Sequence, residues 1–256
     1  AGCGAVAEVI VRLGRLRNEQ DPVRAAALTA LAKVAPLLTA DMAAGLTGLT
    51  TDAVDARDAS AATTRALSTL AADVLACHID VPPLCEWALL TIDLVSTGAQ
   101  VPVLRRFDTV LRRGQEAMVF ERLRGWVEAG VARGRYGPLF ALTQALGKRA
   151  WRLPALQELL RRATGPDTLA SVARTAIGLW LADPRPRPER VAEVLEIDPT
   201  AATIHEVWAT ICTSRTDLLD RVLDGRPRGR FVEPGVRWVP AGAGMRSRPR
   251  RWWLRN

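Results

Sequence analysis

The stretch DPVRAAALTALAKVAPLLT, residues 21–39, is typical of a short helix with a well-defined start. Asp21 is expected to be the N-cap, because aspartate side chains accept hydrogen bonds from the first free amide groups of a helix. Pro22 then falls at the first helical position, where a missing N–H costs nothing. The sequence therefore predicts a helix that starts at this aspartate.

One face of the predicted helix is apolar. Its small and apolar residues recur at the spacing that brings side chains to the same side of a helix. They are Val23, Ala27, Ala30, Leu31 and Val34. Because alanine side chains are short, a neighbouring helix can approach closely. We therefore expect this stripe to be buried against other helices.

A second copy of the pattern lies in residues 58–76, DASAATTRALSTLAADVLA. Its apolar stripe consists of Leu67, Leu70, Ala71 and Val74. Aligning Leu31 with Leu70 gives an offset of 39 residues between the copies. Each copy follows another helical segment, at residues 5–17 and 39–54. The repeated unit is therefore predicted to be a helical hairpin.

The first copy resembles the second helix of a HEAT repeat, which has an aspartate in the turn, then valine and arginine, then small and leucine positions. The matching residues are Asp21, Val23, Arg24, Ala26, Ala27, Leu31 and Val34. In HEAT repeats the aspartate and arginine commonly pair between successive units, so the resemblance implies that Asp21 and Arg24 are structural. The corresponding motif residues of the second copy are Asp58 and Leu70, although Arg65 follows Asp58 by seven residues instead of three.

The rest of the chain continues as helix after helix. Further helices are predicted at residues 82–97, 101–113, 115–132, 138–150, 154–163, 167–182, 188–195 and 199–214. No segment alternates polar and apolar residues with the period of two that a half-buried strand shows. We therefore predict an all-α protein, an α-α superhelix (solenoid) of about five or six irregular HEAT-like helix pairs. It would form one elongated body over residues 1–224, followed by a basic extension, residues 225–256.

The positive charge is concentrated in that C-terminal extension. The formal net charge is +8, from 35 basic and 27 acidic residues. Residues 225–256 hold nine arginines and a single acidic residue, Glu233, which leaves residues 1–224 with 26 basic and 26 acidic residues. The average charge of the body therefore gives no support for a nucleic-acid-binding surface there.

Arginines and aromatic residues occur together in the extension. Arginine neutralises phosphates and aromatic rings stack on bases, so RNA or DNA is a possible partner of this segment. The candidate polyanion-binding residues are Arg226, Arg228, Arg230, Arg246, Arg248, Arg250 and Arg251. Alternatively, the first part of the extension packs its apolar residues on the last helices, and the remainder is a disordered end.

The sequence carries no recognisable catalytic or metal-binding motif. Walker A, GxGxxG, GxSxG and HExxH patterns are missing, and the only histidines are His78 and His205. The cysteines Cys77 and Cys85 lie near His78, and Cys212 follows His205 by seven residues, but no CxxC spacing occurs. We therefore predict a protein that is not an enzyme and has no metal site and no cofactor.

The tryptophans of the body allow two interpretations. They are Trp87, Trp126, Trp151, Trp180 and Trp208. Most are expected to be packing residues, because a tryptophan buries a large area between helices. HEAT-like alkylpurine DNA glycosylases instead use tryptophans and an acidic residue around an exposed lesion, and this enzyme function is kept as the less favoured alternative. The favoured function is a scaffold whose concave face binds a protein or peptide.

Membrane insertion and secretion are not expected. The longest apolar run, residues 84–95, is interrupted by Glu86 and Asp93, whereas a spanning helix needs about 18 apolar residues without charges. The first residues lack the basic start of a secretory signal. Four cysteines without a disulfide-like pattern fit a reducing compartment, so we predict a soluble, cytoplasmic protein with no membrane span.

Overall fold

The fold is all-α over the part of the chain that a computed structural model describes, namely residues 2–14, 19–95, 104–109, 111, 113–223 and 229–232. Every regular element in these ranges is an α-helix or a 3₁₀-helix, which confirms the prediction of an all-α protein. The chain forms two compact units, residues 1–153 and 154–256, where a single body was expected. The predicted domain boundary after residue 224 lies outside the described residues.

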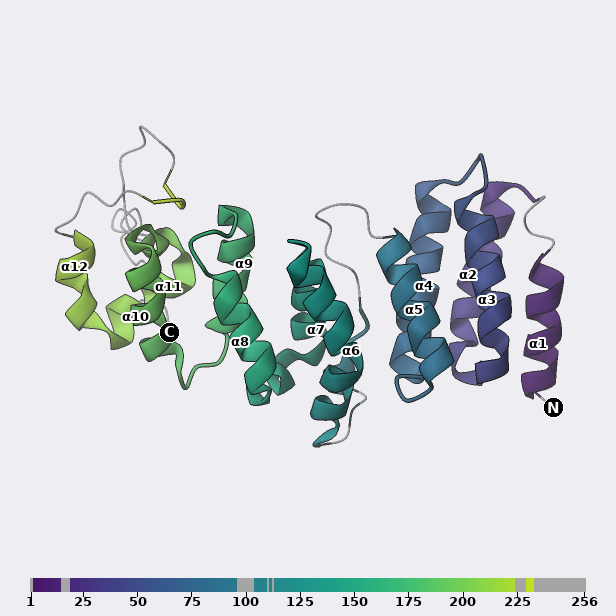
Figure 1. Ribbon diagram of the computed structural model, residues 1–256, viewed down its shortest axis with the longest axis horizontal. Coiled ribbons are helices and arrows are strands. Elements are labelled where there is room, and N and C mark those ends of the chain that lie inside the picture. Colours follow the sequence, from purple (N-terminus) through teal and green to yellow (C-terminus); the bar gives the residue numbers. More distant parts are fainter. Residues whose placement is uncertain are drawn as a thin grey trace, which may run out of the picture. The chain divides into compact units, whose positions relative to one another are not determined.

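The first unit begins with five α-helices and two short 3₁₀-helices. The α-helices are α1 (Gly2–Leu13), α2 (Asp21–Lys33), α3 (Ala43–Val54), α4 (Ala61–Cys77) and α5 (Pro82–Val95). The 3₁₀-helices are η2 (Ala35–Leu37) and η3 (Ala40–Met42). Contacts link α1 to α3 and α3 to α5, while α4 packs on both α2 and α5 (Figure 1). The two sequence copies thus lie directly against each other as α2 and α4.

The buried face of α2 differs by one position from the predicted stripe. Val23 is 48% exposed, whereas Arg24 is only 1% exposed. The buried residues of this face are Arg24, Leu28, Leu31 and Ala32, and Ala35 of η2 continues it. The predicted stripe of α2 was wrong because it was drawn through small and apolar residues alone, and a charged side chain can take a core position when other groups satisfy it.

The buried face of α4 agrees with the predicted stripe. It includes Thr63, Leu67, Leu70, Ala71 and Val74. Each of these residues follows a buried residue of α2, or Ala35 of η2 in the case of Val74, by 39 positions. The offset read from the sequence is therefore also the offset between buried positions. In this register Thr63, not Arg65, is the counterpart of Arg24. The two copies therefore differ in chemistry at the position where the first copy has its arginine.

The predicted N-cap role of Asp21 is wrong. Helix α2 begins at Asp21 itself, and the capping position belongs to Gln20, whose side chain makes no capping hydrogen bond. Ser60 caps α4, with its hydroxyl accepting a hydrogen bond from the Ala62 amide at 3.0 Å. The carboxylate of Asp21 is directed to α4 instead, because three donors lie at the start of that helix.

The first unit ends with α6 (Gln115–Ala132), α7 (Gly137–Leu146) and the 3₁₀-helices η4 (Phe107–Thr109) and η5 (Gly147–Arg152). Of the helix predicted at residues 101–113, the described residues 104–106 are not helical and residues 107–109 form η4. Phe107 is buried, and Arg105 and Arg106 form ion pairs with Asp73 and Asp108. These tertiary contacts outweigh the local preference for a helix.

The second unit contains α8 (Pro154–Ala163), α9 (Ala170–Trp180), α10 (Arg187–Ile197), α11 (His205–Ser214) and α12 (Leu219–Leu223), with η6 (Pro199–Thr203) and η7 (Thr216–Leu218). Helix α8 packs on α9, and α10 on α11, as the pairing in the sequence predicted. The helix predicted at residues 199–214 is interrupted at Ile204, whose φ of −80° and ψ of 129° are extended.

Arg190 connects the two helix pairs of this unit. Its guanidinium donates to the Gln157 side chain at 2.9 Å and to the Trp180 carbonyl, and it lies 5.0 Å from the centre of the Trp180 ring. Among the described helices, none is long and apolar enough to cross a membrane.

Candidate functional site

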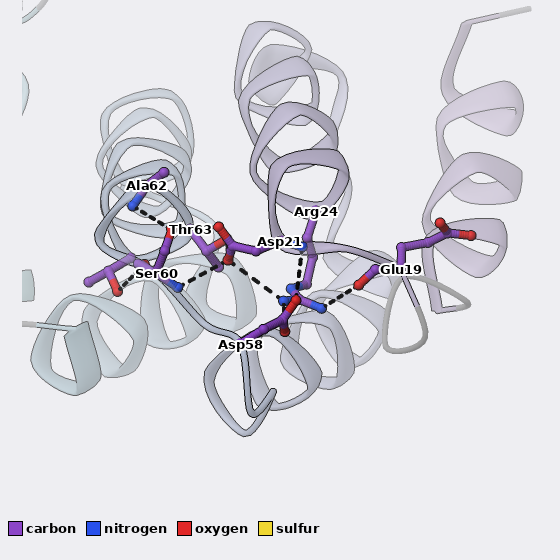
Figure 2. A network of polar contacts seen from close by, with 8 residues as sticks. Glu19, Asp21, Arg24, Asp58, Ser60, Ala62 and Thr63 are labelled. Carbon is purple, nitrogen blue, oxygen red and sulfur yellow. Dashed lines mark hydrogen bonds and ion pairs between the residues drawn. The ribbon is translucent and has the colours of Figure 1, made fainter.

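The predicted motif residues Asp21, Arg24 and Asp58 lie together in a polar network between α2 and α4 (Figure 2). The Asp21 carboxylate accepts hydrogen bonds from the Ser60 amide at 3.0 Å, the Ser60 hydroxyl at 2.5 Å and the Thr63 hydroxyl at 2.6 Å. These hydrogen bonds, from Ser60 first and then Thr63, lower the pKa of Asp21 to about 2. The ionised carboxylate is thus held at the start of α4.

Arg24 links the same helices from inside the fold. Its Nη2 lies 2.5 Å from Asp58 Oδ1, and its Nη1 donates to the Glu19 carbonyl at 2.8 Å. The other Asp58 oxygen accepts a hydrogen bond from the Asp21 amide at 3.0 Å. The hydrogen bond from Arg24 lowers the pKa of Asp58. Because these oxygens already have donors within the fold, the network is suited to holding helices together rather than to binding a ligand.

The predicted motif leucines belong to the packing between the same helices. Leu31 and Leu70 are both buried, on α2 and α4. They occupy equivalent positions in the two copies, since 39 residues separate them. The helix contacts and the polar network therefore bring all five motif residues to one junction.

Arg230 is the member of the tail set that lies in the described residues; Arg226, Arg228, Arg246, Arg248, Arg250 and Arg251 lie outside them. Its guanidinium donates to the carbonyls of Thr164 at 2.5 Å, Gly165 at 2.5 Å and Thr168 at 2.8 Å. Burial lowers the pKa of Arg230, although it stays a cation. This arginine is thus engaged with carbonyl groups inside the second unit, and its role in polyanion binding stays a prediction.

The residues around Arg230 fasten the segment 229–232 to the second unit. The Arg230 amide donates to Asp198 at 3.1 Å, and the Phe231 amide donates to the Thr200 hydroxyl at 3.3 Å. The Phe231 side chain is buried beneath the guanidinium groups of Arg174 and Arg230. This part of the extension is therefore ordered against the helices, as one of the two interpretations of the sequence proposed.

Three of the residues considered as metal ligands, Cys77, His78 and Cys85, belong to the first unit. His78 Nε2 lies 2.8 Å from the Ala35 carbonyl, and Cys85 is buried, with a pKa that desolvation raises. Within the described ranges no group of three or more His, Cys, Asp or Glu side chains is placed to hold a metal ion.

A hollow of about 340 Å³ opens between α5 and α6 in the first unit. Its lining is mainly apolar, from Pro82, Cys85, Leu89, Leu90 and Trp126, with charged groups from Glu86, Asp93 and Arg122. Leu90 is 65% exposed, and Leu94, one turn further along α5, is 53% exposed. We refer to the eight lining residues as the apolar hollow, and Leu94 lies beside them on α5. Sequence analysis missed it because the period of α5 alone does not show which apolar residues a neighbouring helix leaves uncovered.

One side of the apolar hollow is fixed by Asp93. Its Oδ1 accepts a hydrogen bond from the Trp126 indole at 2.9 Å and lies 3.7 Å from the Arg135 guanidinium. A tryptophan and an acidic residue thus form a hydrogen bond at the edge of the hollow. Since the indole N–H and Arg135 both engage the same carboxylate oxygen, Asp93 is placed to orient the tryptophan.

A second hollow, of about 440 Å³, lies beside η5 and is lined by Arg113, Lys148, Arg149 and Arg152. We refer to these four residues as the basic hollow. The charge balance of residues 1–224 concealed it, because the average gives no information about where the charges lie. The run GKRAWR, residues 147–152, was the available signal, since it places three cations within five positions.

Comparisons of the chain with protein-family models, curated proteins and solved structures find no match.

Proposed function

We propose that the chain is a non-enzymatic HEAT-like repeat protein that binds a protein or peptide partner, with the apolar hollow as the contact site. The observation that supports this proposal is the pair of exposed leucines, Leu90 and Leu94, beside a hollow with an apolar lining. Exposed apolar groups next to a concave surface with a few polar groups are typical of recognition sites. The few cysteines favour a cytoplasmic location for this function.

The rim of the apolar hollow defines the chemistry of the partner. Glu86 lies on α5 and Arg122 on α6, both are exposed, and neither forms an ion pair with another described residue. A peptide with one large apolar side chain for the hollow, a basic residue toward α5 and an acidic residue toward α6 complements this arrangement. The buried apolar anchor would carry most of the affinity, and the rim charges would set the orientation.

The test is site-specific crosslinking in cells. A photoreactive phenylalanine replaces Leu90 in one protein and Leu169 in a control, because Leu169 is a 75% exposed leucine of the second unit. We expect a discrete protein to be crosslinked at Leu90 and not at Leu169. A synthetic peptide that spans the crosslinked segment should then bind the purified protein. Leu90→Asp should weaken this binding at least tenfold, and Leu169→Asp should leave it within twofold.

Two results contradict the proposal. One is the same set of crosslinked products from both positions, which indicates nonspecific contact. The other is a peptide affinity that Leu90→Asp does not change, which places the contact elsewhere.

A second candidate function is polyanion binding by the tail. It is supported by the nine arginines and one acidic residue of residues 225–256, of which Arg230 is already engaged. Truncation after Val232 keeps the fastened segment and removes the remaining tail. The full chain should bind single-stranded nucleic acid with a log affinity that falls by about 0.7 per neutralised phosphate for each log unit of salt. If the truncated chain binds nucleic acid as tightly as the full chain, this function is ruled out.

The enzymatic alternative, a HEAT-like DNA glycosylase, has a separate test. Release of bases from alkylated DNA by the purified protein would support it.

A further inference from the structure

The basic hollow combines more positive charge than its surroundings neutralise. Four cationic side chains line it, and one carboxylate, Glu116, lies within ion-pair distance of two of them. Glu116 Oε2 lies 3.4 Å from Arg149 Nη1, and Oε1 lies 3.6 Å from Arg152 Nη1. Arg113 and Lys148 are exposed and form no ion pair within the described residues. Asp108 also lies near Arg149, but it is ion-paired with Arg106. Among the described residues, three positive charges of the hollow therefore remain in excess.

Glu116 is fixed within the protein rather than available to close the hollow. It is buried, and its Oε2 accepts a hydrogen bond from the Gly114 amide at 2.9 Å. Backbone hydrogen bonds, its own amide first, lower the pKa of Glu116, so the group is a carboxylate at neutral pH. Its charge is thus a constant part of the hollow, and it compensates one of the four cations.

The backbone fixes the position of η5, which carries three of the four lining cations, Lys148, Arg149 and Arg152. Gly147, at the start of η5, has a φ of +53°, and a Cβ there would lie 3.0 Å from Asp108 Oδ2. Only a glycine allows η5 to approach η4 this closely in this conformation. Arg149 is anchored further by a 2.6 Å hydrogen bond to the Leu111 carbonyl. Like charges on a free surface spread apart, so this preorganised cluster points to an anionic ligand.

We propose that the basic hollow binds the diphosphate group of a small molecule. A single phosphate ester carries about −1.5 to −2 charges at neutral pH, which is less than the excess of the hollow, whereas two linked phosphate groups match it. Arginine offers paired donors to phosphate oxygens, and Lys148 adds a compact charge. The volume of about 440 Å³ is in the range of small-molecule sites.

Titration calorimetry of the full chain with pyrophosphate at low salt tests the proposal. The variant Arg113→Gln with Lys148→Gln removes two lining charges whose side chains have no partner among the described residues, so the fold should be retained. We expect pyrophosphate to bind with one-to-one stoichiometry and the double variant to bind at least tenfold more weakly. Inorganic phosphate should bind the unaltered protein at least tenfold more weakly than pyrophosphate.

The matched control is Arg57→Gln with Arg65→Gln, which removes the same charge from exposed positions of the first unit. It should change the affinity for pyrophosphate by less than twofold. Equal losses in both double variants would show a general charge effect and overturn the proposal, as would the lack of any pyrophosphate binding. Vesicles with bisphosphorylated inositol lipid form a further arm. Binding to these vesicles without binding to pyrophosphate would assign the hollow to a membrane surface and also overturn the proposal.

Discussion

Arg24 is a charged residue at a core position, and its surroundings explain why the fold accepts it. The guanidinium contacts Asp58 and the Glu19 carbonyl, and its Nη2 lies 3.6 Å from Asp21. A buried charge is costly unless oppositely charged groups and hydrogen bonds satisfy it. In the second copy the equivalent residue, Thr63, donates a hydrogen bond to Asp21. A single carboxylate thus contacts the equivalent positions of both copies.

Asp21 should make the stability of the protein depend on acidic pH. Its pKa is about 2 in the folded protein and near 3.8 ordinarily, so the folded state favours the ionised form. This contribution to stability is present above about pH 4 and is lost as the pH falls toward 2. In Asp21→Asn we expect a lower melting temperature at pH 6 and a shallower decrease between pH 4 and 2. Circular dichroism melts over this pH range provide the measurement.

Asp55→Asn is the matched control for this prediction. Asp55 is an exposed aspartate at the end of α3, and no hydrogen bond joins its side chain to a described residue. Its variant should keep the acid response of the unaltered protein. If Asp21→Asn also keeps this response, the hydrogen bonds from Ser60 and Thr63 do not stabilise the ionised carboxylate.

At the scale of elements, the segment 229–232 shows how a short irregular stretch completes a helical unit. Arg230 donates hydrogen bonds to carbonyls at and beyond the end of α8, where a helix leaves its last carbonyl groups without intrahelical partners. A cation at this end also interacts favourably with the helix dipole. The segment 229–232 therefore caps the C-terminal end of α8, although it lies more than 60 residues further along the sequence. The buried Phe231 side chain anchors it.

Gly229→Ala should release this segment. A Cβ at position 229 would contact the Asp198 carboxylate and lie 2.6 Å from the Thr200 hydroxyl, which is too close for a real contact. The side chains of Asp198 and Thr200 accept hydrogen bonds from the amides of Arg230 and Phe231. Displacing these two side chains therefore breaks the hydrogen bonds that hold the segment. We expect trypsin to cleave after Arg230 at least tenfold faster in the variant, as followed by mass spectrometry. Gly178→Ala, with open space for a Cβ, is the control, and equal rates would contradict the prediction.

At the scale of the whole molecule, each helix pair contacts mainly its neighbours, and the chain divides into two compact units. In such arrangements stability is local, because a defect in one pair is felt by the adjacent pairs. Charge is also a local property, because the average charge of a chain does not describe the charge at one site. The neutral average of residues 1–224 coexists with the basic hollow, where four cations line one concave surface and Glu116 forms ion pairs with two of them.

Arg24→Ala should therefore destabilise one unit without affecting the other. Truncation of a long buried side chain costs about 3 kcal/mol, which corresponds to roughly a hundredfold faster amide exchange through local opening. We expect this increase in α2 and α4 and unchanged exchange in α8 and α11, measured by hydrogen exchange with mass spectrometry. Arg65→Ala, an exposed arginine of α4, should change little. A uniform increase over both units would show that they unfold together.

The sequence by itself determined the helical class, the 39-residue offset and the buried stripe of α4, because these depend on the period of apolar residues along one helix. It also determined the bounds of α6 and α8, which begin and end where local signals place them.

Only the tertiary structure decided the partners of the polar residues. It placed Arg24 in the core, turned Asp21 toward α4, engaged Arg230 with carbonyl groups and gathered the basic hollow from two segments, Arg113 and η5. The physical reason is that hydrogen bonds and ion pairs join residues that are distant in sequence, whereas periodicity describes a single helix. The function of a polar side chain in this protein therefore depends on contacts between helices that the sequence pattern of one helix does not contain.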